Sequence, residues 1–194
     1  MTCQVNKICS LGYLNIKNIA EIRKSLNKDN TKILINALVT SHLDYGNSLL
    51  YGITKKMLNK LQVLQNTSAR VIEKLKRQDR ITETRKQLHW LPIQARIEFK
   101  IIKFTWQCLN NMAPDYLKNK IEIKQTIRPL RDNDKLLLVE PQTNLATYGD
   151  VCFSKVAPKL WNSLPYELRA IESLELFRRN LKPFFLQNSM SRLP

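Results

Sequence analysis

The chain has 194 residues and carries 32 Lys and Arg against 16 Asp and Glu, a formal net charge of +16. With 43% hydrophobic and 25% charged residues, its composition is that of a globular domain and excludes wholesale disorder. Four glycines are too few for a glycine-rich nucleotide loop, and no dinucleotide-binding fingerprint or Walker loop occurs. The basic excess predicts a polyanionic partner, nucleic acid by default and a membrane surface as the weaker alternative.

Helical periodicity dominates the first fifty residues. The mixed apolar and basic segment 18–26 is expected to be helical. A second helix is predicted from Thr31 to about His42, with Asp29 or Asn30 as its cap. The two glycines within 43–53 then predict a bend.

The strongest predicted helix is Lys55–Lys76, with Thr54 as its N-cap. One face is apolar, and the opposite face is basic and about 33 Å long, comparable to one turn of duplex nucleic acid. The candidate nucleic-acid contacts on this face are Lys55, Lys56, Arg70, Lys74 and Arg77. A charged outer face is often mere solvation, but residues 55–103 hold 13 Lys and Arg against 4 Asp and Glu.

The next helix is predicted from about Pro92 to Leu109, with Pro92 at its first position. Apolar residues line two of its sides, so we expect it to be buried between neighbours. Its basic strip comprises Arg96, Lys100 and Lys103, which either line a nucleic-acid groove or extend past the core to solvent. The three tryptophans lie in apolar surroundings, which favours core packing over base stacking.

The C-terminal part alternates short elements with prolines. Pro114 is expected to open a short helix through Asn119, followed by a polar, basic linker over 121–133. Residues 135–139 are predicted to form a strand that pairs with 144–148 as a hairpin.

Helical segments follow this predicted hairpin. Asp150 is expected to cap a short helix that Pro158 limits, and Leu164–Pro165 to break the chain. Ser173 is the predicted cap of a last helix over 174–186, which Pro183 kinks or shortens. The inner face of that helix is predicted to hold Leu174, Phe177, Leu181 and Phe184.

The predicted fold class is therefore mainly α, a helical bundle with a small β-hairpin in the C-terminal third. The predicted regions are a thumb-like basic helical region at 1–80, a central helical region at 81–125 continuous with it, and a C-terminal segment at 126–194.

Residues for catalysis are scarce. His42 and His89 have no nucleophile or carboxylate in register, and the only close acidic pair is Asp132 and Asp134, flanked by basic neighbours. No catalytic or metal-binding residue is predicted. The four cysteines are too irregular for a metal knuckle, which favours reduced thiols in a cytoplasmic or nuclear protein.

No membrane segment is predicted either. The longest uncharged run, residues 33–43, has eleven residues and is shorter than the roughly 20 that span a bilayer. No signal peptide is legible at the N-terminus.

Several stretches of the chain form a distinctive series: ALVTSHLDYGNSLLYGI, LNKLQVLQNTSARVI, HWLPIQARIEFKI with NNMAPDYL downstream, and APKLWNSLP. Together they resemble the region that follows the polymerase core in non-LTR (LINE-type, CR1/jockey-like) retrotransposon reverse transcriptases. The similarity runs from about residue 5 to 187 in the family's order and spacing. Two departures are Gly46, where the family usually has Cys, and Thr67–Ser68, where it has a small apolar pair.

The resemblance implies a thumb over roughly residues 1–80 and a post-thumb segment after it. A thumb is a helical bundle that holds template–primer duplex by its backbone, so RNA and/or DNA bound without sequence preference is the implied partner. The Tyr/Phe-x-Asp-Asp signature that binds catalytic Mg belongs to a palm absent from this sequence, which has no Asp-Asp at all. The chain alone is therefore expected to hold no cofactor and to catalyse nothing, and the rest of the retrotransposon polyprotein is an implied partner.

Three interpretations stay open. The chain is a detached thumb and C-terminal module that binds nucleic acid, or the tail of a longer reverse transcriptase whose gene model has been cut. Alternatively, it is a decayed element remnant or a helical interaction protein retained by the host.

Overall fold

The computed structural model describes residues 1–124, 136–142 and 149–188, and these are mainly α-helical, as predicted. The chain forms two compact units, unit 1 (Met1–Arg96) and unit 2 (Ile97–Pro194). They divide after residue 96, inside the central region 81–125, which was predicted to be continuous with residues 1–80. The three predicted regions stay a prediction.

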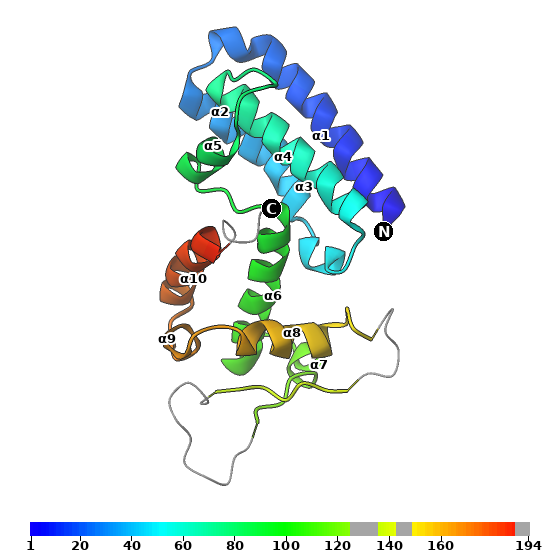
Figure 1. Ribbon diagram of the computed structural model, residues 1–194, viewed down its shortest axis with the longest axis vertical. Coiled ribbons are helices and arrows are strands. Elements are labelled where there is room, and N and C mark those ends of the chain that lie inside the picture. Colours follow the sequence, from blue (N-terminus) through cyan, green and yellow to red (C-terminus); the bar gives the residue numbers. More distant parts are fainter. Residues whose placement is uncertain (125–135, 143–148, 189–194) are drawn as a thin grey trace. The chain divides into compact units, whose positions relative to one another are not determined.

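Unit 1 consists of α-helices joined by short 3₁₀ and π turns (Figure 1). Its elements are α1 (Thr2–Ile22), η1 (Arg23–Ser25), α2 (Lys28–Ile35), the π-helical turn η2 (Asn36–Thr40), α3 (Ser41–Asp44), η3 (Asn47–Leu50), α4 (Lys55–Glu73), α5 (Thr82–Gln87) and the first turn of α6 (Ile93–Leu109).

The core of unit 1 depends on a close approach of α1 to α4, which lie side by side in Figure 1. A Cβ atom at Gly12 would stand 2.7 Å from Leu64 Cδ2 and 2.9 Å from Leu64 Cδ1. Leu64 is fully buried, so its side chain has little room to retreat. Glycine at position 12 therefore lets the leucine pack directly on the α1 backbone.

Both ends of α4 are held by side chains. Thr54 is the N-cap, as predicted, and its hydroxyl accepts from the Met57 N–H at 3.4 Å. At the other end, the Arg23 guanidinium donates to the carbonyls of Val71 (3.0 Å) and Ile72 (2.8 Å). These bonds satisfy carbonyls that have no partner within the helix, and the positive charge complements the helix dipole.

The predicted C-terminus of this helix at Lys76 is wrong, because α4 ends at Glu73. Lys74 adopts a left-handed conformation with φ of 55°, and the Leu75 N–H bonds to the Arg70 carbonyl at 3.0 Å. This is the geometry that terminates many helices, here without the usual glycine.

The predicted cap of the preceding helix is also wrong. Asn27, not Asp29 or Asn30, is the N-cap of α2, and its side chain accepts from the Asn30 N–H at 2.7 Å. Helix then continues through η2 and α3 to Asp44. The predicted bend after it is confirmed, with φ of 61° at Gly46 and 78° at Gly52.

Two glutamines on α4 position the start of α6. Gln62 Oε1 accepts from the Ile93 N–H at 2.9 Å, and buried Gln65 donates to the Leu91 carbonyl at 2.9 Å. The predicted helix from Pro92 to Leu109 is confirmed, with α6 beginning at Ile93.

Unit 2 contains the rest of α6 and four further helices among its described residues: α7 (Asp115–Lys118), α8 (Phe153–Asn162), α9 (Tyr166–Arg169) and α10 (Leu174–Asn188). Its core is aromatic. Phe177 stacks on Trp106 at a ring-centroid distance of 5.7 Å and contacts Trp161 at 6.0 Å. All three side chains are buried, so the prediction of core tryptophans is confirmed for these two residues; Trp90 is likewise buried in unit 1.

The prediction that Pro158 limits a helix is wrong, because Pro158 lies inside α8, which begins after Cys152 instead of Asp150. Pro183 lies inside α10 and does not shorten it, since the helix extends to Asn188; a kink at Pro183 stays a prediction. An internal proline costs a helix about 3 kcal/mol or more, which burial of residues such as Trp161 and Phe185 offsets.

The predicted β-hairpin is not seen. Residues 136–139 form no strand, and residues 144–148, the other predicted strand, lie outside the described residues, as does most of the predicted linker. Instead, Leu138 forms an isolated antiparallel bridge with Ile123. The Asn162 side chain also imitates a strand partner, since its Oδ1 accepts from the Leu138 N–H at 2.9 Å and its Nδ2 donates to the Leu138 carbonyl at 3.0 Å.

The close approach at Gly12 predicts a background-dependent effect of Gly12→Ala. Alanine gains about 1 kcal/mol of helix propensity over glycine, but overpacking against Leu64 costs roughly 1–3 kcal/mol. We expect Gly12→Ala to destabilise the wild-type chain by about 1 kcal/mol and to stabilise the Leu64→Ala variant by about 0.5–1 kcal/mol, since only the clash is removed there. Urea unfolding measures both changes, and equal changes in the two backgrounds would contradict the close approach.

The Asn162 amide predicts local protection of the 136–140 segment. Asn162→Leu removes both bonds to Leu138, which costs about 1–3 kcal/mol and accelerates hydrogen exchange at the Leu138 amide on the order of 10- to 100-fold. The neighbouring control Ser163→Ala, whose hydroxyl bonds only to Leu160, should leave that exchange unchanged. Unaltered exchange in Asn162→Leu would refute this role.

Candidate nucleic-acid interface

The eight predicted contact residues are divided between the two units. Five belong to α4 or to the turn after it, and three lie on α6, of which Arg96 is in unit 1 and Lys100 and Lys103 are in unit 2. Their environments also differ.

Lys55 and Lys56 lie in the first turn of α4 and are exposed. Neither forms an ion pair within the described part of the chain, and no acidic residue occupies that turn. Cations at a helix N-terminus oppose the macrodipole at a cost of roughly 0.3–1 kcal/mol. Their position therefore does not stabilise the helix, whereas an anion at the same place is favoured by both the dipole and the two ammonium groups.

The remaining three residues of this group lie at the other end of α4. Arg70 is half-buried, and its Nη2 lies 3.4 Å from the Asp79 carbonyl. Lys74 caps the helix and Arg77 follows it, both exposed. The predicted continuous face of 33 Å is thus wrong, because α4 is only 19 residues, about 28 Å, long. We call the exposed Lys55, Lys56, Lys74 and Arg77 the α4 cations.

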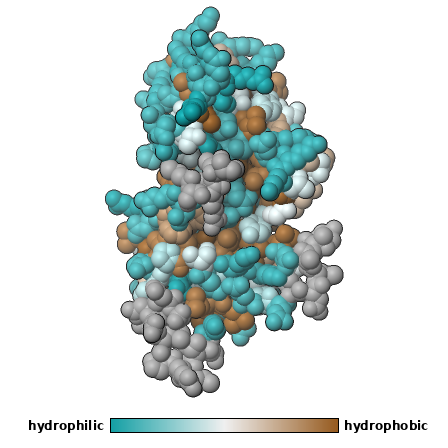
Figure 2. Space-filling view, in the orientation of Figure 1, coloured by the Kyte–Doolittle hydropathy of each residue, from teal (hydrophilic) through white to brown (hydrophobic). Residues whose placement is uncertain are grey.

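Further cations that we did not single out from the sequence lie near the C-terminal end of α4. Lys28 pairs with Glu73 at 2.7 Å, and Arg23 binds the last carbonyls of the helix. Hydrophilic residues cover this end of unit 1 on the face that Figure 2 shows, at the top of the view. The charge runs around residues 23–28 and 74–80 are visible in the sequence, but their proximity depends on the packing of α1 and α2 against α4.

Arg96 has a carboxylate partner within the chain. Its Nε lies 3.2 Å from Asp44 Oδ1, and only 17% of its side chain is exposed. Burial lowers the pKa of Arg96 and Asp44 opposes that effect. Arg96 therefore links α6 to α3 and is not part of the exposed cations.

Lys100 and Lys103 lie on the part of α6 that belongs to unit 2. The Lys100 ammonium stands 5.7 Å from the centre of the Phe104 ring, a cation–π contact. The pKa of Lys103 is lowered by burial first, and then by the positive charges of Arg178 and Lys100. The sequence analysis did not single out Arg178, which α10 brings next to Lys103.

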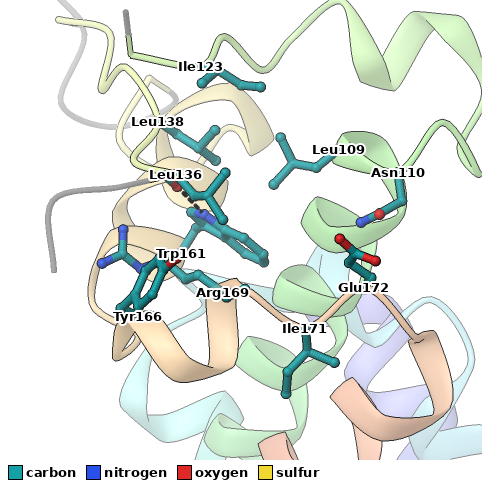
Figure 3. Close-up of a pocket in the computed structure, with 11 residues that line it drawn as sticks. Leu109, Asn110, Ile123, Leu136, Leu138, Trp161, Tyr166, Arg169, Ile171 and Glu172 are labelled. Atoms are coloured by element: carbon teal, nitrogen blue, oxygen red, sulfur yellow. Dashed lines mark hydrogen bonds between the residues drawn. The ribbon is translucent and has the colours of Figure 1, made fainter. Parts of the chain in front are cut away.

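Unit 2 also contains an open pocket of about 330 Å³ (Figure 3). Leucine and isoleucine side chains and Trp161 line one part, and Tyr166, buried Arg169 and Glu172 line the other. The Trp161 indole donates to the Leu136 carbonyl at 2.8 Å, which fixes the ring at the wall. None of the predicted contact residues lines this pocket.

Catalytic and metal-binding groups show no assembly in the described residues. His42 and His89 are exposed on separate elements. No group of three or more His, Cys, Asp or Glu is placed to hold a metal ion in this part of the chain, and Asp132 and Asp134 lie outside it. Among the described helices, none combines the length and apolar character needed to cross a bilayer.

Comparisons with protein-family models, with curated proteins and with solved structures find no match to this chain.

The environment of Arg96 predicts that it contributes to stability instead of binding. Arg96→Met should lower the free energy of unfolding by about 1–2 kcal/mol, because the charge-assisted bond to the half-exposed Asp44 is lost. Arg80→Met, at an exposed arginine with no ion pair in the described chain, should leave stability unchanged. Urea unfolding of both variants gives the comparison, and a stability of Arg96→Met equal to that of Arg80→Met would refute it.

Proposed function

We propose that this chain is the thumb and post-thumb region of a non-LTR retrotransposon reverse transcriptase. In this proposal it holds nucleic acid by the phosphate backbone, without sequence preference and without catalysing DNA synthesis by itself. The observation that carries the proposal is the set of α4 cations, which are exposed and form no ion pair within the described residues.

The charge distribution supports a polyanionic ligand for unit 1. Residues 1–96 hold 17 Lys and Arg against 6 Asp and Glu, a larger excess than residues 97–194 with 15 against 10. A net positive charge of this size makes the basic side chains of the free protein repel one another, and it attracts polyanions from a distance.

The geometry of α4 suits backbone recognition. The helix is fixed at its two ends by Thr54 and Arg23, so Lys55 and Lys56 stand at one end of a rod about 28 Å long, and Lys74 and Arg77 follow its other end. Lysine and arginine side chains at the ends of such a rod suit contacts to phosphates, which fix position along a strand without reading its sequence. Catalysis would belong to a palm with its own aspartates and Mg, supplied by the rest of the polyprotein.

The proposal is tested by the salt dependence of binding. The variant Lys55→Gln, Lys56→Gln, Lys74→Gln, Arg77→Gln should bind a 20-base-pair duplex more weakly. It should also flatten the slope of log K against log salt by about three to four units, since each of the four lost phosphate contacts removes about 0.9. Fluorescence anisotropy at several KCl concentrations, with DNA duplexes and RNA–DNA hybrids of two unrelated sequences, measures this.

A matched control separates these contacts from net charge. The variant Lys7→Gln, Lys17→Gln, Lys120→Gln, Lys159→Gln loses the same number of charges at four exposed positions elsewhere. Its slope should stay within one unit of wild type. Equal slopes in the two variants would overturn the assignment of the α4 cations, and absence of binding by the wild-type chain would overturn the proposed function.

A further inference from the structure

Helices α6 and α10 of unit 2 pack along each other in opposite directions. Phe99 contacts Phe185 edge-to-face at 6.4 Å, and Trp106 stacks on Phe177 at 5.7 Å, so residue numbers rise along α6 as they fall along α10. Arg178 directly follows Phe177, and Lys103 precedes Trp106 by about one helical turn. The packing therefore brings these two cations to the same level of the paired helices.

Three cations gather here, which we call the α6–α10 cluster: Lys100, Lys103 and Arg178. Lys100 and Lys103 are separated by three residues and so lie on one side of α6. None of the three forms an ion pair among the described residues. The positive charges of Arg178 and Lys100 add to burial in lowering the pKa of Lys103, as expected for cations that lie close to it.

The cluster works against the stability of the free chain. Like charges held close together repel, and partial burial of Lys103 strengthens that repulsion. The two helices carry only two acidic residues, buried Glu98 on α6 and exposed Glu175 in the first turn of α10. A bound anion would attract all three cations and so offset the repulsion between them.

We propose that Lys100, Lys103 and Arg178 form a phosphate-binding subsite for a nucleic-acid strand, separate from the α4 cations. This inference rests on the proposed function for the class of its ligand, but on different residues in the other unit. Arg178 supplies a planar fork that matches two phosphate oxygens, and the two lysines supply point charges beside it. The ring of Phe104 holds the Lys100 ammonium at 5.7 Å and so positions it.

The length of the α6–α10 cluster along α6 limits the number of phosphates that it can contact. Lys100 and Lys103 are offset by about 4.5 Å along α6, at 1.5 Å per residue. Three cations within that length serve one or two successive phosphates, so the subsite should contribute about one to two units to the salt slope.

The first test is a charge-removing pair with a matched control on the same full chain. Lys103→Gln, Arg178→Gln should flatten the salt slope for a 20-nucleotide single strand by one to two units. Arg179→Gln, Lys159→Gln removes the same charge at exposed positions on α10 and α8 that are not in the cluster, and should change the slope by less than half a unit. Urea unfolding of both variants confirms that they remain folded.

The second test observes the subsite directly by NMR of the Lys103 side chain. Titration with the oligonucleotide should shift the Lys103 resonances in wild type and in the variant without the α4 cations. Pyrophosphate, a probe of the phosphate site alone, should shift them too. Unchanged resonances with both probes, or equal slopes in the two double variants, would overturn the subsite.

The outcomes separate the two proposals. Suppose that the wild-type chain binds no oligonucleotide while pyrophosphate still shifts the Lys103 resonances. The proposed function is then refuted, and so is a nucleic-acid strand as the ligand of the subsite, but the cluster still binds phosphate. If oligonucleotide binds through the α4 cations and Lys103 does not respond, the proposed function stands and the subsite is refuted.

Discussion

The close approach of α1 to α4 at Gly12 is the constraint on which unit 1 depends. Because Gly12 has no Cβ, Leu64 packs on the α1 backbone and fixes the rotation of α4 about its axis. That rotation turns Gln62 and Gln65 toward residues 91–93, where they hold the start of α6. It also leaves the opposite side of α4 facing solvent, so the exposure of Lys55 and Lys56 follows from the packing of a residue without charge.

Periodicity and capping signals predicted where most helices lie, and failed where a distant side chain decides the local structure. Thr54 was identified as a cap because a hydroxyl before an apolar run is a local signal. The end of α4 at Glu73 carried no such signal, since Lys74 adopts the left-handed conformation in place of glycine. The hairpin prediction failed for a related reason. Residues 136–139 have strand-like composition, but the backbone of Leu138 bonds to the Asn162 side chain, and its isolated bridge is formed with Ile123.

The environments of the predicted contact residues also divide into those that local periodicity indicates and those that depend on distant neighbours. The exposure of Lys55 and Lys56 was predictable, because helical periodicity alone separates them from the buried face. The pairing of Arg96 with Asp44, and the place of Arg178 beside Lys103, depend on tertiary packing between elements far apart in sequence. A basic residue on a predicted helix is therefore a weak indicator of a binding site until its neighbours are known, because the same guanidinium serves either a carboxylate of the fold or a phosphate of a ligand.

The partners of the cations offer a physical criterion for that distinction. Arg23 binds helix carbonyls, Arg96 binds Asp44 and Lys28 binds Glu73, so each of these charges stabilises the fold. Lys55 and Lys56 oppose the dipole of α4, and Lys103 stands beside two like charges, so these positions cost the free chain stability. A phosphate bound at either place would offset the cost there, because it would be attracted by the dipole of α4 in one case and by three like charges in the other. The proposed phosphate contacts therefore rest on what each charge does in the free chain, and not on the number of basic residues.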